Sequence, residues 1–373
     1  MEWKEVRLGD ILNFRRGHDL PHSEMKPGNI PVAGSNGVIG YHDTATPIKP
    51  ILTIGRSGNV GKPYFYEEAW AHNTTLYVDD FKGNDPKFLY YLCQTMPFAN
   101  FGGGSAVPTL NRNHIHPLET KIPVKVDDQR RIASILSSLD RKIELNNKIN
   151  ADLEEMAQAI FKNWFVDFEP FKDGKFVDSE LGMIPEGWKV GSPYEYAKVV
   201  YGAPYKSAKF NDNGEGLPLI RIRDLKDCNP QFYTPEILPQ TEYVNMGDIV
   251  AGMDAEFVPH IWKGNTGLLN QRVCKLIPQQ TSISNLFVLY LMKPELEFVQ
   301  SYKTGTTVSH LGKADIDKFV VVLPPLEVVE ECSKILDSIL QRIKNISAES
   351  RTLSTLRDTL LPRLMSGELE IPE

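Results

Sequence analysis

The chain has 373 residues, of which 41% are hydrophobic and 24% charged, as is typical of a globular protein large enough for two domains. The sequence contains no secretory signal, no apolar run of membrane-spanning length and no CxxC pair, so neither a disulfide framework nor a zinc site is expected. The net charge of −7 argues against a uniformly basic surface. Residues 1–126 nevertheless have a balance of +1 and residues 187–326 a balance of 0, which leaves room for a local basic face on either segment.

Residues 1–126 are expected to form a first, mainly β domain. Its short apolar and aromatic runs are separated by Gly, Asn, Pro and Asp, which predicts strands at Ile30–Val32, Val38–Tyr41, Ile51–Ile54, Tyr64–Tyr66 and Thr75–Val78. The spacing of apolar residues in Pro86–Thr95 predicts a short amphipathic helix. A glycine-rich loop follows, and Thr120–Val124 is expected to be the last strand of the domain.

Residues 127–165 are predicted to form one long helix, because the segment contains no proline or glycine. At about 1.5 Å per residue this helix would be roughly 58 Å long, so its apolar face needs a long partner unless it is an ordinary domain-packing helix. Asn146, Asn147 and Asn150 interrupt that face, as a polar layer that sets the register of pairing would. The apolar face consists of Ile132, Leu136, Leu139, Ile143, Ile149, Leu153, Met156, Ile160 and Trp164.

The rest of the chain repeats this organisation after a polar connector at residues 166–186. Phe287–Leu291 matches Phe88–Leu92 at an offset of 199, and the offset drifts smoothly between other matches, such as Asn270 with Asn73. A second mainly β domain is therefore expected at 187–326, and a second long helix with the C-terminal tail at 327–366. The apolar face of the second helix consists of Cys332, Ile335, Ile339, Ile343, Ile346, Leu353, Leu356 and Leu360.

The predicted fold is α+β, with two mainly β domains joined by two long helices that pair as an antiparallel coiled coil. This arrangement gives the chain a pseudo-twofold internal repeat, because each long helix supplies the partner that the other requires.

No catalytic motif is complete. Gly55–Lys62 resembles a phosphate-binding P-loop, but five residues separate its glycines and Pro63 stands where a Ser or Thr must hold magnesium, so a turn is expected. His114 and His116 lack a third metal ligand and are expected to be loop residues. We therefore expect a non-catalytic binding protein with neither a metal nor a cofactor of its own.

Polar, aromatic and basic side chains occupy corresponding loops of both β domains, and such residues bond base edges and phosphates in DNA-binding proteins. Each of them alone is also compatible with a solvated loop. Since the repeats keep a scaffold and change the presented groups, a target with two unlike halves is expected. The candidates in the first domain are Arg15, Arg16, Arg56, Ser57, Asn59, Asn73, Thr109, Asn111, Arg112 and His114. Those in the second are Tyr201, Lys206, Arg221, Arg223, Asp254, Asn270, Gln271, Arg272, Thr306, His310 and Lys313.

Over its whole length the sequence resembles the specificity subunits of type I restriction-modification systems. The resemblance is most specific in residues 136–172 and 181–190, in the strand-to-helix junctions at 122–136 and 321–336, and in the tail at 356–371. It implies a subunit of a prokaryotic cytoplasm that reads a bipartite double-stranded DNA target with its two β domains, while the helix pair fixes the gap between the half-sites.

The resemblance also implies partners. Two methyltransferase (M) subunits would carry S-adenosylmethionine, and restriction (R) subunits would carry ATP and magnesium. The candidate docking residues are Gln129, Arg130, Phe161, Trp164, Phe165 and Leu361. The second strand-to-helix junction has Glu330 and Glu331 where the first has Gln129 and Arg130, which predicts a different docking mode there. Two alternatives remain: a recognition subunit of another restriction-modification class, and a structural coiled-coil adaptor without DNA specificity.

Overall fold

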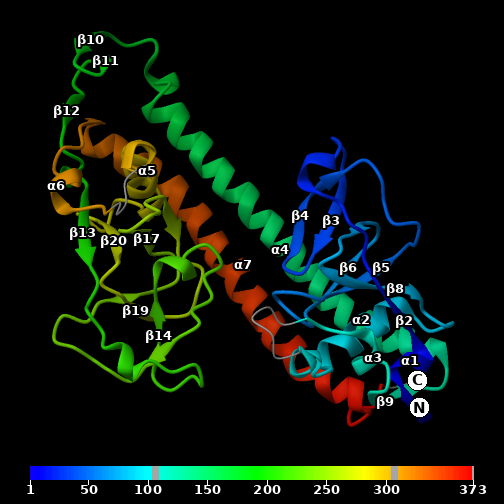
Figure 1. The fold of residues 1–373 in the computed structure, drawn as a ribbon. Helices are drawn as coiled ribbons and strands as arrows, with labels where there is room; N and C mark the ends of the chain where they lie inside the picture. Colours follow the sequence, from blue (N-terminus) through cyan, green and yellow to red (C-terminus); the bar gives the residue numbers. More distant parts are fainter. Residues whose placement is uncertain (103–108, 304–309, 372–373) are drawn as a thin grey trace. The chain divides into compact units, whose positions relative to one another are not determined.

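A computed structural model describes residues 1–102, 109–303 and 310–371 of the protein. The chain divides into two compact units, unit 1 (Met1–Glu144 with Thr352–Glu373) and unit 2 (Leu145–Arg351). Both divisions fall inside the long helices α4 (Val126–Phe165) and α7 (Leu326–Ser366). Each unit therefore combines a β-rich domain with one segment of each long helix (Figure 1).

Unit 1 contains a four-stranded sheet of order β2-β8-β5-β6, a three-stranded sheet of order β4-β3-β7 and the pair β1-β9. Its strands are β1 (Trp3–Arg7), β2 (Asn13–Arg16), β3 (Ile30–Gly34), β4 (Gly37–His42), β5 (Ile51–Gly55), β6 (Pro63–Tyr66), β7 (Trp70–Ala71), β8 (Thr75–Asp80) and β9 (Glu119–Pro123). Its short helices are α1 (Leu8–Ile11), α2 (Pro86–Thr95) and α3 (Arg112–Ile115), with 3-10 turns η1 (His22–Glu24) and η2 (Phe98–Phe101). The predicted strands and the helix at Pro86–Thr95 are confirmed.

Unit 2 contains four-stranded sheets of order β13-β20-β17-β18 and β15-β14-β19-β16, and the pairs β12-β21 and β10-β11. Its strands are β10 (Phe176–Ser179), β11 (Gly182–Pro185), β12 (Lys189–Gly191), β13 (Ala197–Tyr201), β14 (Leu217–Ile220), β15 (Tyr233–Thr234), β16 (Tyr243–Val244), β17 (Ile249–Gly252), β18 (Pro259–Ile261), β19 (Gly267–Leu269), β20 (Val273–Pro278) and β21 (Val321–Leu323). Its helices are α5 (Asn285–Lys303) and α6 (Lys313–Ile316), with 3-10 turns η3 (Glu169–Phe171), η4 (Pro193–Glu195), η5 (Ser207–Lys209) and η6 (Ile222–Asp224).

The two units repeat one topology, which confirms the predicted duplication. The sheet β2-β8-β5-β6 corresponds strand by strand to β13-β20-β17-β18, and each unit has one parallel pair, β3 with β7 and β14 with β19. The correspondence extends to single hydrogen bonds: Leu110 N donates to Arg56 O, and Leu311 N donates to Met253 O, both at 2.7 Å.

One expected match within the repeat is wrong by one residue. Asn270 bridges Ala203 as His72 bridges His18, so Asn270 corresponds to His72 and not to Asn73. The preceding glycines explain why this site is fixed. A Cβ on Gly17 would lie 2.1 Å from His72 O, and one on Gly202 would lie 2.2 Å from Asn270 O. The close backbone approach therefore requires glycine in both units.

Within unit 2, α4 and α7 run antiparallel and are tied by the expected polar layer. Asn146 Nδ2 donates to Glu349 Oε2 at 2.8 Å and to Ser350 Oγ at 3.2 Å, and Asn150 Nδ2 donates to Ser347 Oγ at 3.1 Å. The prediction is confirmed for these two asparagines, whereas Asn147 is exposed. In unit 1 a charged pair replaces the amides, because Arg357 Nη1 donates to Asp140 Oδ1 at 2.9 Å.

The predicted apolar faces are only partly correct. Met156, Leu356 and Ile335 are exposed, although they fit the spacing. Phe161 and Phe165 are buried instead and pack on the Phe287 ring of α5, with ring centroids 5.6 Å and 5.2 Å away. The C-terminal end of α4 contacts a β domain as well as a second helix, so the residues buried there differ from those of the predicted apolar face.

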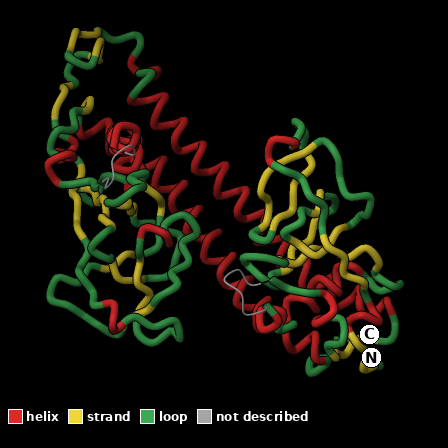
Figure 2. Tube along the Cα trace, in the orientation of Figure 1, coloured by secondary structure: helices red, strands yellow, loops and turns green. Residues whose placement is uncertain are grey.

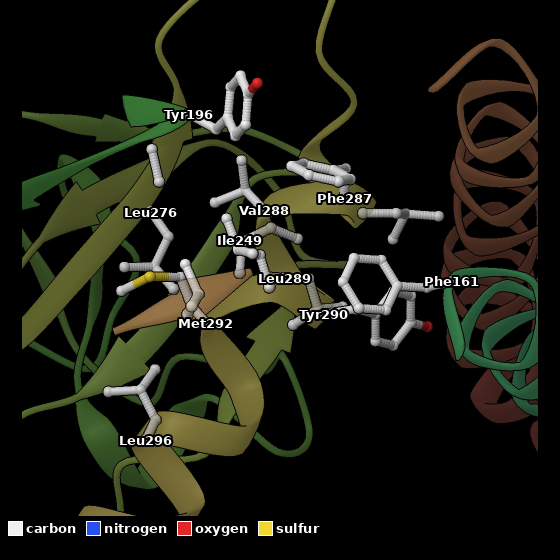
Figure 3. Close-up of a cluster of buried hydrophobic side chains, with 14 of the residues drawn as sticks. Phe161, Tyr196, Ile249, Leu276, Phe287, Val288, Leu289, Tyr290, Met292 and Leu296 are labelled. Atoms are coloured by element: carbon white, nitrogen blue, oxygen red, sulfur yellow. The ribbon is translucent and has the colours of Figure 1, made fainter. Parts of the chain in front are cut away.

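The core of unit 2 lies around the first turns of α5. Figure 3 shows Met292 beside the strand residues Ile249 and Leu276, with Phe287 and Tyr290 on the side of Phe161. The residues after α4 are more structured than a simple connector. They include the β10–β11 hairpin, and Phe168 and Phe171 pack edge-on against Trp188 with centroids 5.4 Å and 5.0 Å apart. Figure 2 shows this short hairpin between loop segments.

Candidate nucleic-acid interface

Unit 1 contains an open hollow of about 420 Å³ that brings together six of the ten candidate residues of the first domain. These residues come from three segments spread over more than 90 positions of the sequence. The lining consists of Arg15, Arg16, Arg56, Thr109, Asn111 and Arg112, with Leu76 and Leu110 beside them. We call this cavity the arginine hollow.

Backbone pairing fixes the position of each arginine. Arg15 and Arg16 end strand β2, which pairs with β8. Arg56 follows β5, where its N–H donates to Thr74 O at 2.8 Å and its carbonyl accepts from Leu110 N at 2.7 Å. Arg112 begins α3, and the preceding Asn111 caps that turn by accepting from Asn113 N at 2.9 Å. The scaffold of the hollow is therefore ordered by main-chain bonds rather than by the arginines themselves.

The charges of the hollow are incompletely balanced. Arg15 Nη1 lies 3.5 Å from Asp79 Oδ2, and Arg16 Nη2 lies 3.5 Å from Asp19 Oδ1, at exposed positions where such pairs contribute little. Arg112 Nη1 donates to the carbonyl of Phe14 at 3.3 Å. Across residues 1–102, 109–303 and 310–371, neither Arg56 nor Arg112 has a carboxylate within 4.0 Å.

His116 lies in the turn after α3, as expected of a loop residue, but its ring is half-buried and supports the hollow. Its ring stacks on Phe14 at 6.2 Å, and its Nε2 accepts from Phe14 N at 3.1 Å. Burial, with the positive charge of Arg112, holds the pKa of the His116 imidazole below its usual value. The ring is therefore neutral near pH 7 and adds no positive charge. No group of three or more metal-ligating side chains occurs among the described residues.

The other first-domain candidates do not line the hollow. Ser57 forms a bridge with Thr109. Asn59 is exposed in the β5–β6 turn, which confirms that Gly55–Lys62 is a turn, and His114 is exposed on α3. The Asn73 side chain donates to Asp19, the carboxylate that also meets Arg16.

In unit 2, Asp254 organises two candidates. His310 Nδ1 lies 2.7 Å from Asp254 Oδ1, and Arg272 Nε lies 3.4 Å from Asp254 Oδ2. Asp254 occupies the place of Ser57 in the repeat and His310 that of Thr109, as the bridges Asp254–His310 and Ser57–Thr109 show. The same scaffold position thus presents a neutral pair in unit 1 and a charged cluster in unit 2.

Two of the other four cationic candidates of unit 2 face carboxylates that were not among the predicted site residues. Arg221 Nε lies 3.2 Å from the buried Asp224, and its guanidinium stacks 4.4 Å over Phe232. Lys313 Nζ donates to both oxygens of Asp317 at 2.9 Å and 2.8 Å. The spacing of Lys313 and Asp317, four residues apart, was a usable sequence signal.

The remaining second-domain candidates do not gather in one place. Lys206 and Arg223 are exposed, and the Lys206 N–H donates to Glu236 Oε2 at 2.9 Å. Asn270 is buried and holds a turn, accepting from Arg272 N at 3.4 Å, so its side chain is less suited to DNA contact than the exposed Gln271.

Tyr201 is half-buried, and burial raises the pKa of its phenol. Thr306 lies outside the described residues.

Three of the six docking candidates, Gln129, Phe161 and Phe165, are buried. Gln129 is 1% exposed: its Oε1 accepts from Asp85 N at 2.9 Å, and its Nε2 donates to Asn84 Oδ1 at 2.9 Å and to Pro123 O at 3.1 Å. Phe161 and Phe165 belong to the core of unit 2. The Gln129 amide is fully bonded, whereas Phe161 and Phe165 also line an open pocket of about 270 Å³ beside α5. The candidates that stay wholly or partly accessible are Arg130, Trp164 and Leu361.

The first turn of α7 also differs from the expected alignment with α4. Val329 N donates to Pro325 O at 3.2 Å, as Gln129 N donates to Lys125 O at 3.3 Å, so Val329 rather than Glu330 occupies the place of Gln129. Val329 is fully buried. At the position of Gln129 and Val329, the two long helices therefore differ in their internal packing and not in surface charge.

None of the helices, among the residues described, is long and apolar enough to cross a membrane.

Comparison with known proteins gives a consistent match. A family model described as the type I restriction modification DNA specificity domain matches residues 1–155 and 185–353. The chain is 28% identical to the type I restriction enzyme MjaIX specificity subunit of Methanocaldococcus jannaschii, covering 77% of this chain and 70% of that protein. It is 23% identical to the HindI specificity subunit of Haemophilus influenzae, covering 98% and 94%.

A solved structure has the same fold. The crystal structure of a type I restriction-modification system S subunit from M. genitalium aligns with a TM-score of 0.58 at 14% identity, covering 100% of this chain and 97% of that one.

Proposed function

Because this chain belongs to the type I restriction-modification DNA specificity family, we propose that it reads a bipartite double-stranded DNA target, one half with each β-rich domain. The chain is the non-catalytic specificity component of such a system. In this proposal two M subunits and the R subunits dock on it in a prokaryotic cytoplasm. S-adenosylmethionine belongs to the M subunits and ATP with magnesium to the R subunits.

One observation carries the proposal: the two units keep one scaffold and present different chemistry at the same positions. Arg56, Ser57 and Thr109 in unit 1 correspond to Met253, Asp254 and His310 in unit 2. Side chains that bond base edges differ between A·T and G·C pairs, so two unlike surfaces suit two unlike half-sites. A single symmetric target would favour identical surfaces instead.

The direct test is sequencing of methylated adenine in cells that carry the intact system. We expect one motif with two defined halves and an undefined spacer. Substitution of Arg272 and His310 by Ala should change only the half read by unit 2, while substitution of Ser57 and Thr109 by Ala should change only the other half. If either variant changed both half-sites of the methylated motif, the proposal that each domain reads its own half-site would be contradicted.

The long helices support a spacing role. At about 1.5 Å per residue, the 40 residues of α4 extend roughly 60 Å, more than one DNA turn of about 34–36 Å. We propose that the paired helices set the spacer. Deletion of four residues from α4 and of four facing residues from α7 should then change the spacer in the methylated motif, and an unchanged spacer would reject the role.

The alternative of a structural adaptor makes a different prediction. An adaptor would not confer salt-dependent binding to one bipartite duplex on the complex with the M subunits. The four basic side chains in the arginine hollow favour the DNA reader, because a protein-binding face of an adaptor does not require unbalanced positive charge.

A further inference from the structure

The two recognition domains differ in charge at the arginine hollow and its counterpart in unit 2. The counterpart is identified by the paired glycines, the Leu110–Arg56 and Leu311–Met253 hydrogen bonds, and the short helices α3 and α6. In the order Arg15, Arg16, Arg56 and Arg112, the corresponding residues of unit 2 are Val200, Tyr201, Met253 and Lys313. Three arginines are therefore replaced by uncharged residues.

The fourth cation is neutralised in unit 2 by a single difference. Arg112 and Lys313 each begin a short helix, and the residue that ends it is His116 in unit 1 and Asp317 in unit 2. Asp317 binds the Lys313 ammonium at 2.8 Å and 2.9 Å. His116 instead uses Nε2 to accept from the Phe14 N–H, so it offers Arg112 no negative charge.

Four like charges around one hollow repel one another unless an anion is present. The two carboxylates near the rim do not supply full compensation. Asp79 also accepts from Asn13 Nδ2 at 2.6 Å, Asp19 also accepts from Asn73, and each meets its arginine only at 3.5 Å. The buried Leu76 and Leu110 beside the arginines keep water from one side, which strengthens any charge interaction in the hollow.

We propose that the arginine hollow of unit 1 holds a backbone phosphate of DNA, and that unit 2 has no equivalent phosphate site. A guanine edge is read by one bidentate arginine, whereas a phosphate accepts from several donors at once. Four arginines that line one hollow therefore fit a phosphate better than a single base edge. This inference rests on the proposed function and adds an asymmetry to it: the half-site read by unit 1 supplies more of the salt-dependent part of binding.

The test uses the complete chain assembled with its M subunits and a duplex with the methylated motif. In the variant R56Q/R112Q no carboxylate is deprived of a partner, so folding should be preserved, as thermal melting of the complex would check. The plot of log Kobs against log [NaCl] should become less steep by about 0.9 for each phosphate that the variant no longer neutralises. The matched variant K313Q in unit 2 should change the slope by less than half as much. R56K/R112K should restore most of the slope.

A second measurement locates the phosphate. Duplexes with one uncharged methylphosphonate at successive positions should bind the wild-type complex more weakly at one position in the half-site of unit 1. R56Q/R112Q should show no further weakening at that position, and its methylated motif should be unchanged. Three results would overturn the phosphate assignment. The salt slope of R56Q/R112Q could equal that of the wild type, every methylphosphonate could weaken the variant as much as it weakens the wild type, or the variant could methylate a motif in which one base is relaxed. If the wild-type complex binds no bipartite duplex at all, the proposed function fails as well.

Discussion

The two recognition domains share the strand order of one four-stranded sheet, yet they balance charge in opposite ways. In unit 1, four arginines line one hollow, and Arg56 and Arg112 have no carboxylate within 4.0 Å among the described residues. In unit 2, most cationic candidates face an acid: Arg272 and His310 meet Asp254, and Lys313 meets Asp317. The two copies of a duplicated scaffold can therefore keep the same backbone hydrogen bonds although one copy presents arginines without close carboxylates and the other presents cations paired with carboxylates.

The first turns of the long helices show the same principle inside the protein. In unit 1 the amide of Gln129 binds the N–H of Asp85, the N-cap residue of α2. In unit 2 the corresponding Val329 is apolar, and the start of α5 is fixed by Ser333 Oγ, which accepts from Ser284 N at 3.0 Å. In both units a side chain of the long helix thus accepts a hydrogen bond from the N–H of the residue before the packed helix, but a different helix position supplies that side chain.

The largest expected difference between the units concerns their aromatic cores. Phe287→Ala should destabilise unit 2 by about 3–5 kcal/mol, because the ring is fully buried and touches Phe161, Phe165 and Tyr196. The repeat-equivalent Phe88→Ala should cost less, since among the described residues the Phe88 ring makes no ring-to-ring contact of the kind that surrounds Phe287. Hydrogen exchange of peptides from each unit would measure both effects, and equal loss of protection in the two units would contradict this difference.

The first turn of α4 in unit 1 should be next in sensitivity. Gln129→Val gives unit 1 the residue of unit 2, but leaves the Asp85 N–H and the Pro123 carbonyl without their partner. We expect a loss of about 1–3 kcal/mol for each group left unpaired, measured by urea unfolding. The neighbouring exposed substitution Arg130→Ala should change stability by less than about 0.5 kcal/mol. A neutral effect of Gln129→Val would show that water replaces the amide.

The ties between the long helices should respond differently to salt. Arg357→Gln in unit 1 and Asn150→Ala in unit 2 should each cost about 1 kcal/mol, the first discounted because the Asp140–Arg357 pair is about 30% exposed. Near 1 M NaCl, where the screening length is about 3 Å, only the cost of Arg357→Gln should shrink. Thermal melts at two salt concentrations would measure both costs. A cost of Asn150→Ala that depends on salt would contradict the prediction, because a hydrogen bond between neutral groups is not screened.

The smallest expected effect comes from removing the carboxylate that pairs with Lys313 in unit 2. The hydrogen bond from Lys313 holds the pKa of the Asp317 carboxyl below its usual value, so the pair stays charged at neutral pH. Asp317→Asn should free the Lys313 ammonium and make the salt dependence of DNA binding slightly steeper, by at most about 0.9 in the slope. Lys313→Gln in the same background should remove the increase, and a persistent increase would assign it to another group.

The sequence by itself determined the repeat, most strands and both long helices, because strand and helix periodicity are local properties that survive without knowledge of neighbours. It also identified Asn146 and Asn150 as a polar layer, since amides in an apolar stripe require partners. The repeat alignment was wrong by one residue where it paired Gln129 with Glu330 and Asn73 with Asn270; the structure pairs Gln129 with Val329 and His72 with Asn270.

Only the tertiary structure decided which predicted residues act together. Arg16, Arg56 and Arg112 lie far apart in the sequence, and long-range backbone hydrogen bonds bring them to one hollow. Periodicity likewise could not show that Phe161 faces a core while Met156 faces solvent, because both fit a helical stripe. Burial and charge balance depend on the neighbours that a long-range fold supplies, and those neighbours are what turn one duplicated scaffold into two different surfaces.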